Sequence, residues 1–240
     1  MFVALLVFWQ LAGTYISDRW ISTPVAIFGR LADWTGRDLF MHLGVTLTEI
    51  AAGLAIGVPL GIFVGVMLGR LRNVAAVLHP FVVVMNSLPI VALAPLLIMW
   101  FGIGLMPKIV LVAFVSFLLL FFNTFAGARA VDEEQIDALA LMGASGPERF
   151  LKVVLPGCTA WIFAGLKNAL PYALIGAVIG EMMVSRAGLG HLVSRAGQQF
   201  DMTGIYAGLF VLMVLGSVLN EAVSLAERFL LRWRGEGAGA

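Results

Sequence analysis

The sequence has few charged residues and almost no cysteine. Only 12% of its 240 residues are charged, against about 25% in a typical soluble domain. Cys158 is the single cysteine, which excludes an intrachain disulfide and a cysteine metal cluster. The net charge of +1 gives no reason to expect nucleic acid as a partner.

Histidine and the motifs of common enzymes are scarce as well. His42, His79 and His191 lie far apart without the spacing of a metal site, so we expect a structural role for each. No H-E-x-x-H motif is present, which argues against an intramembrane enzyme of that type. The phosphate-binding pattern G-x4-G-K-[ST] is also absent, so any ATP hydrolysis is expected in another chain.

Hydrophobic sequence is what the chain has in abundance. Hydrophobic residues make up 61% of it, and the mean hydropathy is +1.00. Between Arg72 and Arg129 the only charged residue is Lys108, and this gap is several times the ~20 residues that cross a bilayer. A membrane β-barrel would show short alternating segments instead. The sequence therefore predicts an all-α polytopic membrane protein with a single transmembrane domain over residues 1–240.

Six apolar segments are predicted to span the membrane. The first lacks the basic start and the cleavage site of a signal peptide, so we interpret it as a membrane helix. The mixed segment 18–42 follows it, and Ser22-Thr23-Pro24 predicts the start of a short amphipathic helix at the interface. The predicted spans are 1–17, 43–69, 75–100, 107–126, 159–184 and 203–230.

The distribution of lysine and arginine gives an orientation. Placing the loop 127–157 inside leaves eight basic residues on the cytoplasmic side and six outside, which favours cytoplasmic termini. The inside set is Arg70, Arg72, Arg129, Arg149, Lys152, Arg228, Arg232 and Arg234. The outside set is Arg19, Arg30, Arg37, Lys108, Arg186 and Arg195.

Glycine and proline mark two of the spans. The second span carries a glycine at every fourth position, which lets another helix approach closely. We favour packing within the chain over a dimer seam. Pro89 and Pro95 interrupt the third span, either as a packing kink or as a bend that lines a path. The glycines are Gly53, Gly57, Gly61, Gly65 and Gly69.

Charged side chains inside a span are costly and usually face a bundle interior or a cavity. Lys167 and Glu181 share a face of the fifth span but lie about 21 Å apart along its axis, so they cannot touch. In one interpretation both line a pathway and Lys167 attracts an anionic substrate. In the other interpretation, Lys167 pairs with a neighbouring helix and Glu181 lies at the outer interface. We favour this second interpretation for Glu181 and leave both open for Lys167. The candidate pathway residues are Asn86, Pro89, Lys167, Asn168 and Glu181.

A polar segment, Gly127–Pro156, interrupts the apolar sequence. Asp132 precedes two glutamates, a pattern typical of a helix N-terminus. This helix is predicted to stop at Gly143. In the second half of the polar segment, Ser145 and Glu148 have the spacing of a capping box. This spacing predicts a new helix, which we expect to end at Leu155-Pro156. These signals alone leave open whether the segment is an ordinary loop or a rigid lever for a partner.

The same segment resembles the EAA motif, EAA-x3-G-x9-I-x-LP, of permease subunits from ATP-binding-cassette (ABC) importers. The matching residues are Asp137-Ala138-Leu139, Gly143 and Val153-x-Leu155-Pro156, with Asp, Leu and Val in place of Glu, Ala and Ile. Other stretches are similar to nitrate/sulfonate/taurine-type permeases. They include Leu88-Pro89, Ala92-Leu93-Ala94-Pro95-Leu96, Trp100-Phe101-Gly102-Ile103-Gly104, Asn123-Thr124, Glu181-Met182 and Gly188-Leu189-Gly190.

The resemblance implies the fold of a type I importer permease in the bacterial inner membrane. It implies transport of a small solute, such as a sulfonate, taurine, nitrate or a vitamin precursor. The implied partners are a second permease copy, two cytoplasmic ATPases and a periplasmic or lipid-anchored binding protein. No cofactor is expected in this chain, because ATP and Mg²⁺ would bind the ATPase.

The resemblance also implies residues that couple transport to the ATPase. They are Asp137, Ala138, Gly143, Ala144, Ser145, Leu155 and Pro156, to which we add the polar Glu148, Arg149 and Lys152 of the second helix. The alternative function is an ion-gradient-driven secondary transporter. It predicts inverted repeats and intramembrane ion ligands, and the sequence shows no convincing repeat.

Overall fold

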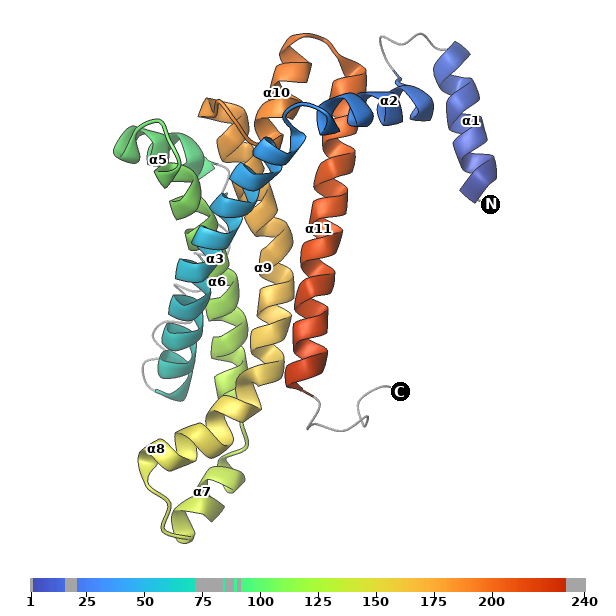
Figure 1. Ribbon diagram of the computed structural model, residues 1–240. Coiled ribbons are helices and arrows are strands. Elements are labelled where there is room, and N and C mark those ends of the chain that lie inside the picture. The colour runs from blue at the N-terminus through green and yellow to red at the C-terminus, as the bar shows by residue number, and fades with distance from the viewer. Residues whose placement is uncertain (1, 16–20, 72–83, 85–88, 90–91, 232–240) are drawn as a thin grey trace. The chain divides into compact units, whose positions relative to one another are not determined.

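The computed structural model describes residues 2–15, 21–71, 84, 89 and 92–231, and within these ranges all regular secondary structure is helical (Figure 1). The all-α prediction is therefore confirmed. The helices are α1 Phe2–Tyr15, α2 Pro24–Thr35, α3 Leu39–Arg70, α5 Leu93–Phe101, α6 Met106–Arg129, α7 Glu133–Leu141, α8 Gly146–Arg149, the π-helix η2 Phe150–Val154, α9 Leu155–Val184, α10 Leu189–Gln198 and α11 Met202–Leu230.

Four of the described helices are long and apolar enough to cross a membrane: α3, α6, the continuous helix Gly146–Val184, and α11. They correspond to the second, fourth, fifth and sixth predicted spans. The first predicted span contains α1, whose 14 residues fall short of the ~20 that cross a bilayer.

The third predicted span, 75–100, lies largely outside the described residues. Its described part shows that a continuous helix over 75–100 is wrong, because Pro89 is not helical and α5 begins only at Leu93. Pro95 falls in the first turn of α5, where the missing N–H of proline costs no helical hydrogen bond. The two prolines therefore do not kink one long helix.

The chain forms two compact units. The first unit comprises Met1–Ala51, Val91–Leu111 and Leu174–Ser217. The second unit comprises Ala52–Ile90, Val112–Ala173 and Val218–Ala240. The helices α3, α6, α9 and α11 each contribute residues to both units.

In the second unit, the glycine stripe of α3 lies against α6. A Cβ added at Gly61 would lie 2.7 Å from both the Leu120 Cβ and the Phe117 carbonyl oxygen. One added at Gly69 would lie 2.7 Å from the Ala128 Cβ. Such distances leave no room for a side chain, so the two helix backbones approach closely. The interpretation of the stripe as packing within the chain is confirmed.

In the first unit, α2 is fastened to the start of α11. The side chain of Thr23 caps α2 by accepting from the Ala26 N–H at 3.3 Å, which confirms the predicted helix start. The Ser22 and Thr203 hydroxyls lie 2.9 Å apart, and Phe28 packs edge-on against Phe210 with ring centroids 6.0 Å apart. These contacts hold the first half of the amphipathic helix against the start of α11.

A methyl group at Gly61 tests the α3–α6 contact. The backbone carbonyl of Phe117 cannot yield to it, so we expect Gly61→Ala to destabilise the protein by about 1–3 kcal/mol. Gly44→Ala is the matched control, since it lies on the same helix with no atom within 4 Å of its added Cβ. Thermal unfolding in detergent compares the two, and equal melting temperatures would contradict the close packing.

Candidate functional site

The polar segment predicted to couple to a partner forms two short helices joined at Gly143. Asp132 starts α7, and its carboxylate accepts from the Glu134 N–H at 2.9 Å. Gly143 has a φ of +83°, in the left-handed region that favours glycine. The Gly143 N–H donates to the Ala140 carbonyl and the Ala144 N–H to the Leu139 carbonyl, each at 3.0 Å, which is the Schellman ending of a helix.

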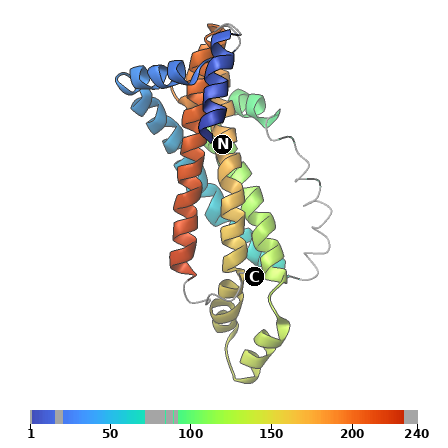
Figure 2. The same ribbon diagram turned by 90° about the vertical axis from the view of Figure 1, so that its right-hand side faces the viewer.

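The chain becomes helical again immediately after this turn. The backbone N–H of Ser145 donates to Glu148 Oε2 at 2.8 Å, and the Ser145 hydroxyl donates to the same oxygen at 2.9 Å. Pro147 lies in the first turn of α8, as predicted. Figure 2 shows the resulting elbow, with α7 and α8 facing each other across the turn.

The prediction that Leu155-Pro156 ends this second helix is wrong. The helix runs without a break from Gly146 to Val184 through η2. A proline inside an α-helix loses a hydrogen bond and clashes with the carbonyl four residues earlier. In η2 the Leu155 N–H donates to the carbonyl of Phe150, five residues back, so the wider π turn accommodates Pro156. The short helix is thus a rigid extension of α9.

A small hydrophobic core anchors the two short helices at their membrane end. It combines side chains from α3, α6, α7, η2 and α9 with one residue of the α6–α7 connection. Arg70 at the end of α3 adds an ion pair of 3.2 Å to Glu133 in the first turn of α7. Both arms of the elbow are therefore tied to the transmembrane helices. The buried residues are Val66, Ala128, Val131, Ile136, Val154 and Cys158.

The surface of the elbow is exposed and partly apolar. Leu141 and Met142, which directly precede Gly143, are 90% and 84% exposed. Sequence reasoning missed this pair, although both fall off the face that Ile136 buries. Exposed apolar side chains at the tip of a projecting element are typical of a protein-binding surface. Of the predicted coupling residues, Asp137, Ala138, Gly143, Ser145, Glu148 and Lys152 are exposed, and Ala144, Arg149, Leu155 and Pro156 are half-buried.

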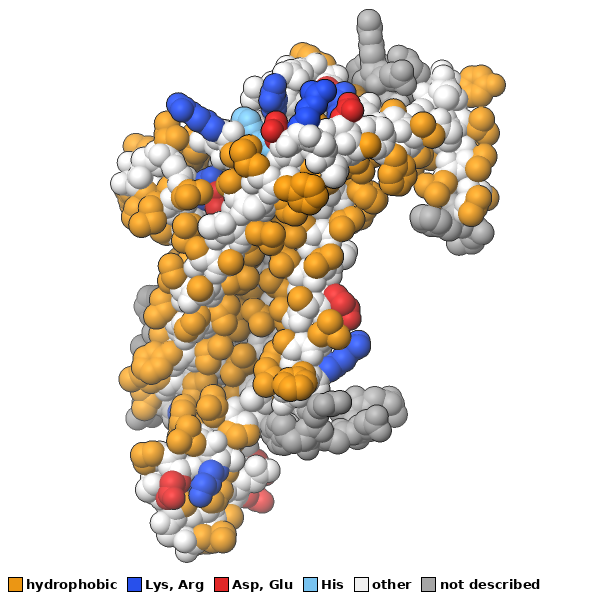
Figure 3. Space-filling model, viewed as in Figure 1, with side chains coloured by type: hydrophobic (Ala, Val, Ile, Leu, Met, Phe, Trp, Pro, Cys, Tyr) orange, Lys and Arg blue, Asp and Glu red, His pale blue; other side chains and the backbone are white. Residues whose placement is uncertain are grey.

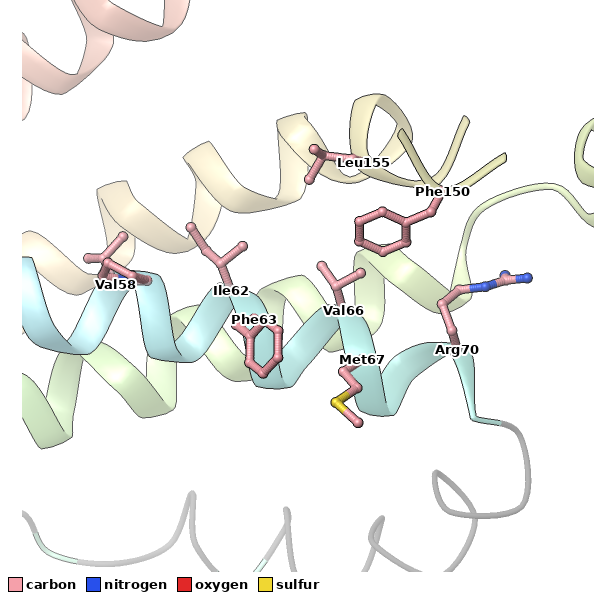
Figure 4. A pocket seen from close by; sticks show the side chains of 9 residues that line it. Val58, Ile62, Phe63, Val66, Met67, Arg70, Phe150 and Leu155 are labelled. Atoms are coloured by element: carbon pink, nitrogen blue, oxygen red, sulfur yellow. The ribbon is translucent and has the colours of Figure 1, made fainter. Parts of the chain in front are cut away.

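The root of the elbow borders an apolar groove of about 680 Å³ in the second unit. Figure 4 shows Phe150 and Leu155 on one side of it, opposite Ile62 and Val66 of α3. Arg70 lies at the end of the groove. Leu155 thus contributes to packing at the point where the elbow joins α9.

The predicted pathway residues do not form one cluster in the described structure. Lys167 forms an ion pair with Glu227 of α11, which confirms the alternative in which it pairs with a neighbouring helix. Asn168 and Pro89 are exposed, and Asn86 lies outside the described residues.

Glu181 is buried among protein side chains. It is only 1% exposed, and its predicted place at the outer interface of the membrane stays a prediction. Its carboxylate accepts hydrogen bonds from the Thr46 hydroxyl and the Gly190 N–H, each at 2.6 Å. This burial was not predicted, because α3 and α10 cover this turn of α9 and sequence periodicity does not show which helices are neighbours.

Glu181 belongs to a cap that other helices provide for α10. The first N–H groups of a helix have no partner within it, and Gly188 before α10 has no side chain to supply one. Three side chains from α3 and α9 take this role. The N–H groups of Gly188, Leu189 and Gly190 donate to His42 Nδ1, Thr46 Oγ1 and Glu181 Oε2 at 2.9, 2.9 and 2.6 Å, respectively. A carboxylate at this end also complements the helix dipole.

A buried ion pair joins α3 to the first turn of α6 in the same unit. Glu49 is fully buried and pairs with Lys108, which is 3% exposed. The ammonium of Lys108 also donates to the Ser185 hydroxyl at 3.1 Å. Among the described residues, Lys108 is the only counter-ion of Glu49, and the buried carboxylate of Glu181 also interacts with that of Glu49. This ion pair thus links the buried polar side chains of α3 to the first turn of α6.

Comparison with known proteins identifies the family. The model of the family described as "Binding-protein-dependent transport system inner membrane component" matches residues 57–233. The chain belongs to this family of ABC importer permeases. Its members form the membrane part of a transporter, so the chain is a multi-pass membrane protein with a transport role, and the predicted resemblance is confirmed.

Individual members of the family are similar over nearly their full length. The chain is 30% identical over 234 residues to the formylaminopyrimidine transport permease protein ThiX of Halalkalibacterium halodurans, covering 97% of this chain and 94% of the relative. It is 34% identical to the riboflavin transport system permease protein RibX of Chloroflexus aurantiacus, covering 95% and 87%. It is 30% identical to the taurine transport system permease protein TauC of Escherichia coli, covering 98% and 88%.

Solved structures share the fold. An inward-facing conformation of the MetNI methionine ABC transporter matches with a TM-score of 0.62 and 21% identity, covering 80% of this chain and 94% of the solved chain. An amino acid ABC transporter with histidines matches with a TM-score of 0.64 and 18% identity, covering 84% and 97%. The predicted importer permease fold is therefore confirmed.

Removing one partner of the buried ion pair tests its importance. Lys108→Met leaves the Glu49 carboxylate buried without a counter-ion, which typically costs about 3–5 kcal/mol. We expect this permease to unfold at a clearly lower temperature in lipid nanodiscs.

The matched control removes both charges. Because Glu49 then carries no charge, we expect the double variant Glu49→Gln/Lys108→Met to recover part of the lost stability, while the buried Glu181 carboxylate, which Lys108 also attracts, still lacks that cation. A single and a double variant of equal stability would contradict a role for Lys108 as the essential counter-ion.

Proposed function

We propose that this permease forms the translocation pathway for a small organic anion and couples its uptake to ATP hydrolysis in a partner ATPase. The elbow of α7 and α8 carries this proposal. It projects an exposed apolar tip, Leu141-Met142-Gly143, and continues without a break into the transmembrane helix α9.

The proposed assembly contains a second copy of the permease, two ATPase subunits and a binding protein that delivers the solute. ATP and Mg²⁺ belong to the ATPase. The elbow and both termini lie on the cytoplasmic side of the inner membrane, an orientation supported by the excess of basic residues on that side. Association is stabilised by the burial of the apolar tip in a groove of the ATPase.

The elbow transmits motion because it is stiff at each joint. The Schellman turn fixes α7 against α8, and η2 fixes α8 to α9. The hydrophobic core around Val131 and Ile136 fixes α7 to the transmembrane helices. A displacement of the tip by the ATPase is therefore passed to α9 instead of being absorbed by a flexible loop.

The proposed substrate class is a small organic anion, a sulfonate in the first instance. The names of similar permeases mention aliphatic sulfonates and taurine, and also formylaminopyrimidine and riboflavin. Lys167 contributes less to anion recognition than its sequence position indicated, because Glu227 already neutralises it. We assign this pair to holding α9 against α11.

Two glycines of the elbow form a matched pair of test sites. Gly143 and Gly146 are both exposed, and neither has an atom within 4 Å of an added Cβ, but only Gly143 has a positive φ. Alanine in the left-handed region costs about 1–2 kcal/mol. We therefore expect Gly143→Ala to reduce ATP-driven uptake several-fold and Gly143→Trp to abolish it, while Gly146→Ala leaves uptake near the wild-type rate.

The measurement uses the permease reconstituted with its ATPase and binding protein in proteoliposomes. Co-purification of the ATPase with each variant reports docking, and uptake per ATP hydrolysed reports coupling. Unaltered uptake in Gly143→Trp, or uptake driven by an ion gradient without the ATPase, would overturn the coupling proposal.

A further inference from the structure

A polar pocket of about 250 Å³ lies in the first unit between α2, the start of α3, and α10. Figure 3 shows that blue and red side chains gather over these helices. Most of the residues that line the pocket carry charge or donate hydrogen bonds, and no coupling or pathway residue of the proposed function belongs to it. It is thus separate from the elbow.

Only some of the charged side chains that line the pocket form ion pairs with other described residues. Arg30 forms an ion pair of 2.6 Å with Asp201, whose carboxylate also accepts from the Gly204 N–H at 3.0 Å. This pair is structural, because it joins α2 to the start of α11. Arg37 and Arg195 also line the pocket, and within the described part of the chain neither forms an ion pair.

The balance of charge favours a monoanion. Three arginines and two aspartates line the pocket, which gives a formal charge of +1 with neutral histidine. The Arg30–Asp201 pair cancels, so the remaining charged residues of the lining are two arginines and one aspartate, Asp38, none of which forms an ion pair with another described residue. A ligand with one negative charge neutralises this excess, whereas a dianion would leave a surplus negative charge beside Asp38.

The two free arginines are carried by elements that are fixed to each other. His42 lines the pocket and stacks on His191 of α10, with ring centroids 6.0 Å apart. Its Nδ1 accepts from the Gly188 N–H at 2.9 Å, so the remaining nitrogen, Nε2, carries the proton of the neutral ring and is a further donor. The cap of α10 by α3 and α9 thus fixes the backbone of α10 beside the start of α3 before any ligand binds, which lowers the entropic cost of binding.

We propose that this pocket binds a small oxyanion with one negative charge, a sulfonate or a carboxylate, between Arg37 and Arg195. The fork of a guanidinium group matches the paired oxygens of such anions. The volume lies below the ~300–1,000 Å³ of sites for drug-sized ligands, so the ligand is compact. This inference deepens the proposed function, on which it rests for the role of the ligand as the transported solute.

Binding is measured on the full chain in lipid nanodiscs by calorimetry, with ethanesulfonate as the probe. Loss of one charged hydrogen-bonding partner weakens binding about tenfold. We therefore expect Arg37→Gln and Arg195→Gln each to raise the Kd about tenfold, and the double variant to show no measurable binding. Inorganic sulfate, a dianion, should bind more weakly than ethanesulfonate, and ethanolamine, a cation of similar size, should not bind.

Two controls separate the pocket from general charge effects. Arg186→Gln removes the same charge from an exposed arginine of the same unit that does not line the pocket, and its Kd should equal that of the wild type. Trp34 lines the pocket, so ethanesulfonate should change the tryptophan fluorescence of the wild type but not of Trp34→Phe. Equal losses in Arg186→Gln and Arg195→Gln would overturn the proposal.

The carboxylate of a partner protein shares the chemistry of the proposed ligand. If the isolated chain binds no free anion, but Arg37→Gln and Arg195→Gln weaken attachment of the binding protein, a protein side chain occupies the pocket and the proposal is overturned.

Uptake by the reconstituted transporter distinguishes failure of the pocket from failure of the proposed function. Wild-type sulfonate uptake that Arg37→Gln/Arg195→Gln leaves unchanged would refute the pocket and keep the function. Ethanesulfonate binding that both arginines control, without sulfonate uptake, would support the pocket and refute the proposed substrate.

Discussion

A polar group that is removed from water must find its partner inside the protein, and the described structure depends on this constraint. Hydrocarbon offers no hydrogen bonds, so an unpaired N–H or carboxylate costs several kcal/mol there. The first unit meets the constraint by bringing side chains from distant helices to one place. His42, Thr46 and Glu181 accept from the start of α10, and Lys108 neutralises Glu49. These contacts also determine where α10 lies on α3 and α9.

The second unit has a different feature, which is a continuous connection between the solvent-exposed tip of the elbow and the membrane helix α9. Close backbone approach along the glycines of α3 holds α6 in place. The π turn before Pro156 keeps α8 and α9 continuous where a proline would otherwise break the helix. A permease that is driven by another protein needs such a connection, because a flexible loop would absorb the motion.

Local signals in the sequence predicted the elbow in detail. Asp132, Gly143, Ser145 and Glu148 act on hydrogen bonds within four residues of themselves, and each has the predicted role. The predicted end of the second short helix at Pro156 was wrong, because a π turn before the proline can compensate for it. No signal in the sequence indicated this π turn. The burial of Glu181 had no local signal either, because it depends on α3 and α10, and its partner Thr46 is 135 positions away.

The sequence by itself determined the membrane class, most of the long spans and the turn chemistry of the elbow, because hydropathy, caps and helix breakers act over a few residues. The tertiary structure alone decided which charged groups are paired, which are buried and which remain free. The partners in the cap of α10 are up to 146 positions apart, and their meeting depends on which helix faces pack together. The pocket with two unpaired arginines follows from the same packing, because Arg37 and Arg195 become neighbours only when α10 is fixed on α3.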